Sequence, residues 1–185
     1  MRSTPLFSIR KSNTLNKDNM NCSSGRLRFR ELKMDDAKRL YEVYSDKEAM
    51  KFRGSKPMET LEDAKEFIRN QRLINQELVT VRQGVESLKE AELIGSIMYR
   101  FNRVKKNECE IGYSIGRKFW GQGFGNEIVK LMVETLKKNT EIENVIAWSN
   151  KANIPSIKIL EKNGFTFIEQ EGQPSDNYLY QKRNN

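Results

Sequence analysis

Three glycines at alternate positions, Gly121, Gly123 and Gly125, stand directly before a helical pattern, and they restrict the folds open to this chain. Without side chains at these positions, a ligand can approach the backbone closely. The first turn of the following helix adds free amide groups and a dipole that favours negative charge. The loop therefore predicts a nucleotide-like ligand with a pyrophosphate group.

Two common phosphate-binding loops do not fit this glycine run. Between Gly121 and Gly125 the chain lacks the Lys followed by Ser or Thr of a P-loop, which argues against magnesium-nucleotide chemistry. The alternating spacing also departs from the dinucleotide-binding fingerprint, which leaves two residues before its third glycine. Because glycine is the default turn residue, the run alone is equally compatible with a flexible turn. The flanking segments decide between these interpretations.

A strand is predicted before the loop and a helix after it. Residues 108–115 alternate apolar and polar side chains, and the apolar face consists of Cys109, Ile111, Tyr113 and Ile115. After the loop, apolar residues recur at the spacing of one helix face. They are Ile128, Leu131, Met132 and Leu136, with Thr135 beside them.

A second strand and helix follow. Residues 144–148 predict a short apolar strand. Residues 153–163 predict a helix that has a polar cap, Pro155 in its first turn and Gly164 at its end. A further strand is expected to begin at Phe165.

The remaining elements complete an α/β domain. Strands are predicted over 27–32, 79–85, 93–101 and 177–181, with a break at Gly95. Helices are predicted over 34–45 and 60–76, the second opening on a capping-box variant formed by Thr60 and Asp63.

The chain resembles the GNAT superfamily of acetyl-coenzyme A-dependent N-acetyltransferases, and within it the Rim-type branch, named for the acetylation of ribosomal-protein N-termini. The resemblance covers residues 26–182. Trp120 stands where other branches have Gln or Arg, as is common in the Rim-type branch. The residues that carry the resemblance are Glu110, Ile111, Gly112, Tyr113, Trp120, Gly121, Gln122, Gly123, Phe124, Gly125, Asn153, Ser156, Leu160, Glu161, Lys162, Asn163, Gly164 and Phe165.

The resemblance implies a GNAT fold, in which a mixed, twisted sheet of six to seven strands is flanked by about four helices. Residues 26–185 would form this domain, and residues 1–25, rich in Ser and Asn, read as a flexible tail. The resemblance also implies acetyl transfer from acetyl-coenzyme A to a primary amine by direct attack in a ternary complex. The expected coenzyme-binding residues are Ile115, Arg117, Trp120, Gly121, Gln122, Gly123, Phe124, Gly125, Asn126, Asn153 and Ser156.

The absence of histidine limits the choice of catalytic base. A carboxylate, a tyrosine or a water relay must then accept the proton of the amine. We expect Glu110 as the base and Glu108 in reserve, both on the strand that opens for the pantetheine arm in the family. The alternative is that these carboxylates only solvate a strand end or pair with a lysine. In the family, strand amides, here near Ser114 and Ile115, polarise the thioester oxygen.

The departing thiolate also needs a proton. Many relatives keep a tyrosine at the position of Leu160, and this chain does not. Ser156, on the same predicted helix, is therefore the expected donor, although a hydrogen bond at the helix start would equally explain it. Asn153 resembles the family asparagine that binds the coenzyme arm, and a role as N-cap is its alternative.

The acceptor pocket is expected between the two N-terminal helices and the later strands. Its candidate residues, each of which could instead belong to the core, are Phe52, Arg53, Met98, Tyr99 and Tyr113. An α-amine, with a pKa of about 7.7–8.0, needs a weaker base than a lysine amine at about 10.4, which favours a protein N-terminus as acceptor. An aminoglycoside, a polyamine or an amino acid remains an alternative acceptor.

Functions from other classes also stay open. A non-catalytic acetyl-coenzyme A sensor would use the same glycine loop. An RNA- or ribosome-binding module would use the basic surface, since 33 Lys and Arg residues outnumber 25 Asp and Glu residues for a formal charge of +8. These charges are scattered, no RNA-recognition signature is present and part of the excess can serve the polyanionic coenzyme, so we expect no nucleic-acid partner.

The composition sets the remaining limits. A chain of 185 residues suffices for one domain with its own core, as a monomer or a homodimer. Two cysteines, Cys22 and Cys109, without zinc-site spacing predict neither a disulfide framework nor a metal site. No apolar run approaches 18 residues, so we expect no membrane span, no secretory signal and a cytoplasmic location.

Overall fold

The computed structural model describes residues 21–74, 78–169 and 176–184. The α-helices are α2 (Ala37–Tyr44), α3 (Lys47–Met50), α4 (Leu61–Arg69), α5 (Phe124–Lys137) and α6 (Ile154–Lys162). The strands are β1 (Leu27–Arg30), β2 (Arg72–Ile74), β3 (Leu78–Ser87), β4 (Glu92–Asn102), β5 (Glu108–Ile115), β6 (Asn144–Asn150), β7 (Thr166–Ile168) and β8 (Asn177–Arg183). Short 3-10 helices precede α2, as η1 (Met34–Asp36), and α5, as η2 (Arg117–Phe119).

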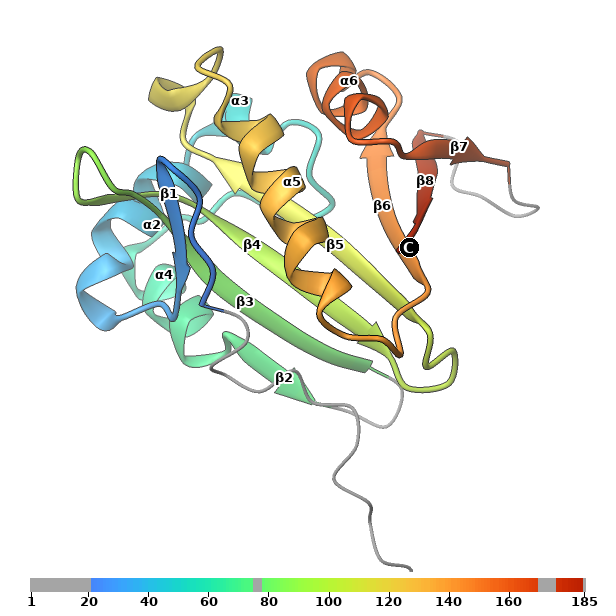
Figure 1. Cartoon of the computed structure of the whole chain (residues 1–185). Helices are drawn as coiled ribbons and strands as arrows, with labels where there is room; N and C mark the ends of the chain where they lie inside the picture. Colours follow the sequence, from blue (N-terminus) through green and yellow to red (C-terminus); the bar gives the residue numbers. More distant parts are fainter. Residues whose placement is uncertain (1–20, 75–77, 170–175, 185) are drawn as a thin grey trace, which may run out of the picture.

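The strands form one mixed sheet in the order β1-β3-β4-β5-β6-β8-β7, with β2 added beside β3. Every neighbouring pair is antiparallel except β5 and β6, which run parallel. Helix α5 crosses one face of the sheet, and α2 and α4 lie behind the other (Figure 1). The expected fold class is confirmed. The described residues form eight strands and not six to seven, because β2, which was not predicted, also joins the sheet.

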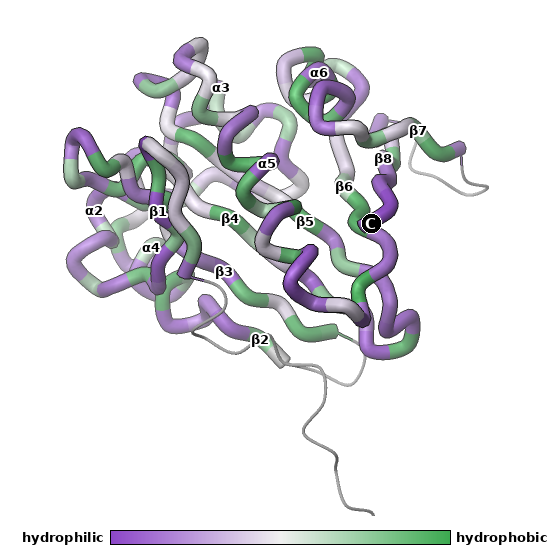
Figure 2. The backbone as a smooth tube through the Cα atoms, viewed as in Figure 1, coloured by the Kyte–Doolittle hydropathy of each residue, from purple (hydrophilic) through white to green (hydrophobic). Residues whose placement is uncertain are grey.

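Two apolar clusters hold these layers together. The larger joins α5 and α6 to the front of the sheet and includes the buried residues Tyr99, Ile128 and Met132. The smaller lies between α2, α4 and the back of the sheet, around Leu40, Ala64 and Ile68. Figure 2 shows hydrophobic and hydrophilic positions alternating along α5, as expected for a helix with one buried face.

The helix predicted over 60–76 is shorter than expected. Thr60 and Asp63 form the predicted capping box, but α4 ends at Arg69. The next residues form β2, which pairs with β3 at the edge of the sheet. The helix-like spacing did not reveal this pairing because it depends on a strand that follows later in the chain.

The expected break at Gly95 is a shift in strand pairing and not the end of a strand. Strand β4 runs from Glu92 to Asn102, but its register against β3 shifts beside Gly95, because Val85 pairs with Gly95 whereas Glu86 pairs with Leu93. On its other edge Gly95 pairs with Ile115 of β5. A Cβ atom at Gly95 would lie 2.1 Å from the carbonyl oxygen of Ser114. This glycine therefore permits a close approach of two backbones instead of ending a strand.

Part of the segment expected as a tail packs on the domain. Cys22 is buried, Ser23 forms a β-bridge with Arg28, and the Ser24 hydroxyl donates to the Glu127 carboxylate. Residues 1–20 lie outside the described residues. Residues 22–24 therefore contact the domain that was expected to begin at residue 26.

Candidate active site

The glycine loop joins the end of β5 to the start of α5. Gly121 and Gly123 adopt the left-handed backbone conformation, with φ of 72° and 83°. Gly123 is the N-cap of α5 and supplies no capping side chain. The side chain of the N-cap residue therefore does not occupy the first amides of this 14-residue helix, and such amides favour a negatively charged acceptor.

Gly125 has a different role from the other two glycines. It is buried, and a Cβ atom there would lie 2.7 Å from Cδ1 of Ile159 on α6 and 3.7 Å from the Tyr113 ring. Helix α5 can approach α6 and β5 because this position has no side chain. Its contribution is close packing of the helices that flank the loop.

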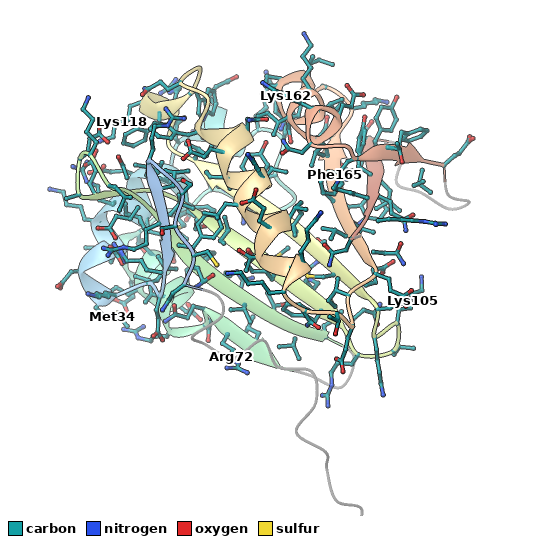
Figure 3. All side chains as sticks on the ribbon, in the orientation of Figure 1. Met34, Arg72, Lys105, Lys118, Lys162 and Phe165 are labelled. Carbon is teal, nitrogen blue, oxygen red and sulfur yellow. The ribbon has the colours of Figure 1, made fainter. Side chains whose placement is uncertain are left out.

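Polar contacts fix the loop in place. The Trp120 indole nitrogen donates to the carbonyl oxygen of Ile115 at 2.8 Å, and the Gln122 side chain donates to that of Lys118 at 2.9 Å. These two residues thus support the loop through their side chains. Figure 3 labels Lys118 just before the loop and Lys162 on α6, which lie at the same end of the domain.

An ion pair that the sequence did not suggest lies beside the loop. Arg26 contacts Glu127 at 2.7 Å, donates to the carbonyl oxygen of Gln122 at 3.2 Å and stacks on the Phe124 ring at 4.5 Å. Burial alone would raise the pKa of Glu127, but hydrogen bonds from Ser24 and Arg26 hold it below its usual value. The segment before β1 is thereby tied to the first turn of α5.

Strands β5 and β6 separate at the loop end of the sheet. Among the described residues they pair at only three positions, from Glu108–Asn144 to Glu110–Ile146. Beyond these pairs the two strands diverge toward the end where α5 and α6 begin (Figure 1). The second half of β5 therefore has a backbone edge that does not pair with β6, and this unpaired stretch between the two strands is called the opening below.

The amides along this edge can be assigned from one hydrogen bond. The Gly116 amide donates to the carbonyl oxygen of Ile94 on β4 at 2.9 Å. Because successive strand amides point to opposite edges, the Ser114 amide faces β4 and the Ile115 amide faces the opening. Of the two expected amide donors, the one at Ile115 is thus available to a ligand.

Two hydroxyl groups meet across the opening. The Tyr113 hydroxyl on β5 donates to Ser156 Oγ on α6 at 3.4 Å, and burial raises the pKa of Tyr113 while this hydrogen bond lowers it. Asn153 caps α6 by accepting from the Ser156 amide at 3.3 Å, and Leu160 is buried. The structure thus supports the alternative of an N-cap role for Asn153.

Glu110 lies on the other face of β5 and pairs with Arg100. The Arg100 Nη1 atom lies 2.9 Å and 3.0 Å from the two carboxylate oxygens. Burial raises the pKa of Glu110, and the charge and hydrogen bonds of Arg100 oppose that rise. Glu110 therefore has an ion-pair partner, as in the alternative given from the sequence, but the partner is an arginine and not a lysine. Glu108 lies two residues away along the strand.

The expected acceptor residues divide between the two faces of the sheet. Met98 pairs with Gly112 on the α2 face, where Arg53 also donates to the Ser114 hydroxyl. Tyr99 and Tyr113 point to the α5 face instead, and Tyr99 is fully buried in the main core. The grouping of all these residues in one pocket is therefore wrong, because neighbouring residues of a strand face opposite sides.

Phe52 is half-buried beside Arg53, on the segment after α3. Sequence reasoning missed Arg82, Arg100 and Tyr44, which also lie on the α2 face. The alternation of β3 and β4 could have placed the two arginines on that face.

A cavity of about 260 Å³ lies on the α2 side of the loop. Its charged lining residues already form ion pairs, including Arg117 with Asp46 at 2.9 Å and Lys118 with Glu92 at 2.8 Å. It contains none of the expected catalytic residues. In the described ranges no group of three acidic, cysteine or histidine side chains could hold a metal ion, and no helix there is long and apolar enough to cross a membrane.

Comparison with known proteins gives the family. Residues 26–166 match the acetyltransferase (GNAT) domain family. The uncharacterized N-acetyltransferase YoaA of Bacillus subtilis is 28% identical over 162 residues, which are 84% of this chain and 92% of that protein.

Solved structures share the fold at low sequence identity. An acetyltransferase of the GNAT family from Bacillus anthracis has a TM-score of 0.77 at 23% identity, covering 89% of this chain and 99% of that one. The spermidine N-acetyltransferase of Vibrio cholerae, solved with CoA and spermine, has a TM-score of 0.72 at 15% identity, covering 87% and 97%. An acetyltransferase from Salmonella typhimurium that modifies the N-terminal serine of a 50S ribosomal subunit protein has a TM-score of 0.68 at 15% identity, covering 86% and 96%.

The family match covers most of the chain, and the opening and the glycine loop occur in one continuous domain. Acetyl-coenzyme A is the acetyl donor of this family. The protein belongs to the GNAT family and is an N-acetyltransferase.

Proposed function

We propose that the protein acetylates a protein N-terminal α-amine, by direct attack on acetyl-coenzyme A in a ternary complex, as a member of the Rim-type branch. The observation that carries this proposal is the opening between β5 and β6, which has the glycine loop at its end and candidate proton-transfer groups on its two faces. A coenzyme arm entering from one face and an amine from the other would meet at β5. This arrangement requires no acetylated enzyme intermediate.

In this proposal the loop and α5 hold the pyrophosphate, and the pantetheine arm lies in the opening beside β5. The Ile115 amide donates to the thioester oxygen, whose negative charge grows as the amine attacks. The Ile115 carbonyl group is held by Trp120, so this peptide segment is anchored before the coenzyme arrives.

Glu110 would accept the proton of the amine, directly or through one water molecule. Its carboxylate lies on the α2 face, opposite the face of α5 and α6. The amine would therefore arrive from the α2 side. The ion pair with Arg100 holds the carboxylate in one orientation and favours its ionised form, which can accept a proton.

Replacement of Glu110 by glutamine is expected to lower kcat about 100-fold with little change in the affinity for acetyl-coenzyme A. Because burial raises the pKa of Glu110, the acidic limb of the kcat/KM profile should have its midpoint above the ordinary glutamate value of about 4.3. That limb should vanish in Glu110→Gln. Steady-state kinetics across pH, with Glu108→Gln in parallel, provide the measurement; a larger loss in Glu108→Gln would exchange the two roles.

Ser156 would donate its hydroxyl proton to the departing thiolate, and Tyr113 would donate a proton to Ser156 in turn. The tyrosine stays protonated because burial raises its pKa. In one step, the Ser156 hydroxyl proton moves to sulfur and the Tyr113 proton moves to Ser156 Oγ. Solvent then reprotonates the tyrosine.

Ser156→Ala is expected to lower kcat about 10-fold or more while the dissociation constant for acetyl-coenzyme A changes less, because a donor to a developing thiolate matters most in the transition state. Tyr113→Phe should give a smaller loss of the same kind. Single-turnover kinetics and calorimetry separate the two effects. Equal losses in kcat and affinity would show that Ser156 only contacts the bound coenzyme.

The proposed acceptor is tested by acetyl transfer to a panel of ribosomal-protein N-terminal peptides, polyamines, aminoglycosides and amino acids, read by mass spectrometry. Transfer to peptide α-amines at the highest kcat/KM is the expected result. Coenzyme binding without turnover on any amine would identify a sensor instead. Preferential turnover of a small amine would overturn the protein N-terminus as acceptor.

A further inference from the structure

Three arginines lie on the α2 face of the sheet, over strands β3, β4 and β5. Arg82 on β3 stands opposite Met98, which stands opposite Gly112, so one row of residues crosses three strands. The neighbouring row contains Arg100 and Glu110. Arg53 reaches the row on the other side, where its guanidinium donates to the Ser114 hydroxyl.

Aromatic rings hold two of these guanidinium groups. Arg53 lies over the Tyr44 ring at 4.7 Å, and Arg82 lies over the Phe67 ring at 5.0 Å. The two rings contact each other, with centroids 5.1 Å apart, and the Tyr44 hydroxyl is 2.6 Å from the Ser96 hydroxyl on β4. The arginines are therefore positioned by packed residues of α2 and α4 instead of extending freely into solvent.

The cluster carries excess positive charge. Glu110 compensates Arg100, but among the described residues no carboxylate lies within ion-pair distance of Arg53 or Arg82. Both are half-buried. Burial lowers the pKa of Arg82, and the charges of Arg53 and Arg100 lower it further, so the three groups act on one another. Arg53 donates to the Ser55 and Ser114 hydroxyls and Arg82 donates to the carbonyl oxygen of Asn70, but these neutral acceptors do not balance the two charges. A half-buried guanidinium without a carboxylate partner is costly, and a bound anion would relieve that cost.

We propose that this arginine cluster, Arg53, Arg82 and Arg100, binds a carboxylate of the acceptor, so that the preferred acceptor is a protein N-terminus with an acidic residue next to the reacting amine. This inference rests on the proposed acetyl transfer to an α-amine. A guanidinium fork matches a carboxylate in shape and charge. The same charges repel a polyamine and disfavour the protonated form of the attacking amine.

The test compares two hexapeptides that differ only at the second position, aspartate in one and asparagine in the other. The wild-type protein is expected to acetylate the acidic peptide with a kcat/KM at least about 10-fold higher, the usual range for a charge-assisted contact. Arg82→Gln should remove most of that preference by slowing the acidic peptide alone. Arg82→Lys, which keeps the charge and loses the fork, should retain part of it.

Arg69→Gln is the matched control, because it removes the same charge from an exposed residue at the end of α4, paired with Glu62. It should leave the peptide preference unchanged. Equal rates for the two peptides in the wild type, or a preference that survives in Arg82→Gln, would overturn the inference.

Failure of the inference is separate from failure of the proposed function. If neither peptide is acetylated, the proposal of a protein N-terminus as acceptor is wrong, and the cluster is then tested with free aspartate against spermidine. Faster transfer to aspartate, lost in Arg82→Gln, would support an anionic acceptor of another class. Faster transfer to spermidine would overturn the cluster as an acceptor site.

Discussion

We expect calorimetry to show that Gly123→Val lowers the affinity for acetyl-coenzyme A by about 100-fold or more, which corresponds to about 2.7 kcal/mol in binding free energy. Gly123 is the N-cap of α5 and has a φ of 83°. Among the described residues outside the loop itself, the nearest atom to a Cβ placed there belongs to the Arg26 guanidinium, at 3.6 Å. The valine side chain would fill the space that the pyrophosphate needs above the first amides of the helix.

The matched control is Gly164→Val at the end of α6. Gly164 has a φ of 79°, so both variants place a branched residue in the left-handed region, at a cost of roughly 1–3 kcal/mol. The nearest atom to a Cβ at Gly164 is the movable end of Lys182. This variant should bind the coenzyme normally, and a folded Gly123→Val with wild-type affinity would contradict the phosphate loop.

Gly125→Val is a poorer test of the same loop. Its side chain would collide with Ile159, because a Cβ alone already lies 2.7 Å from that side chain. We expect Gly125→Val to lose stability together with coenzyme affinity.

Local patterns predicted most of the fold. The alternation around Ile111 gave the bounds of β5, and Pro155 and Gly164 marked the two ends of α6. The pattern failed where pairing with a distant segment decides the structure. The residues after Arg69 form β2 because β3 offers them an edge, and no local propensity records that edge.

The candidate site was predicted only in part. Glycines before a helix reveal a loop because their effect is local. The contacts that orient the site join residues far apart in the chain, such as Arg26 with Glu127 and Arg53 with Ser114, which are 101 and 61 residues apart. From the sequence, Leu160 was the position at which a tyrosine donor was expected and is missing. In the structure Tyr113 of β5 lies next to Ser156 instead.

The second large effect is expected from Gly95→Ala. A Cβ atom at this position would lie 2.1 Å from the Ser114 carbonyl oxygen and 3.1 Å from the Ile115 Cα atom. These are backbone atoms in a paired strand, so they cannot move aside as a side chain can. We expect a loss of more than about 3 kcal/mol in the free energy of unfolding, which corresponds to a fall in Tm of roughly 10 °C for a domain of this size.

Gly112→Ala separates this effect from the general effect of removing a strand glycine. In the part of the chain that the structure describes, the added Cβ at Gly112 meets only the end of the Met98 side chain, at 3.4 Å. Thermal unfolding should therefore show a much smaller change in this variant. Gly95→Ala should also slow acetyl transfer in any folded fraction, because a displaced β5 carries the Ile115 amide away from the thioester oxygen. A Tm for Gly95→Ala within about 2 °C of the wild type would mean that β4 and β5 separate at this point more easily than their pairing implies.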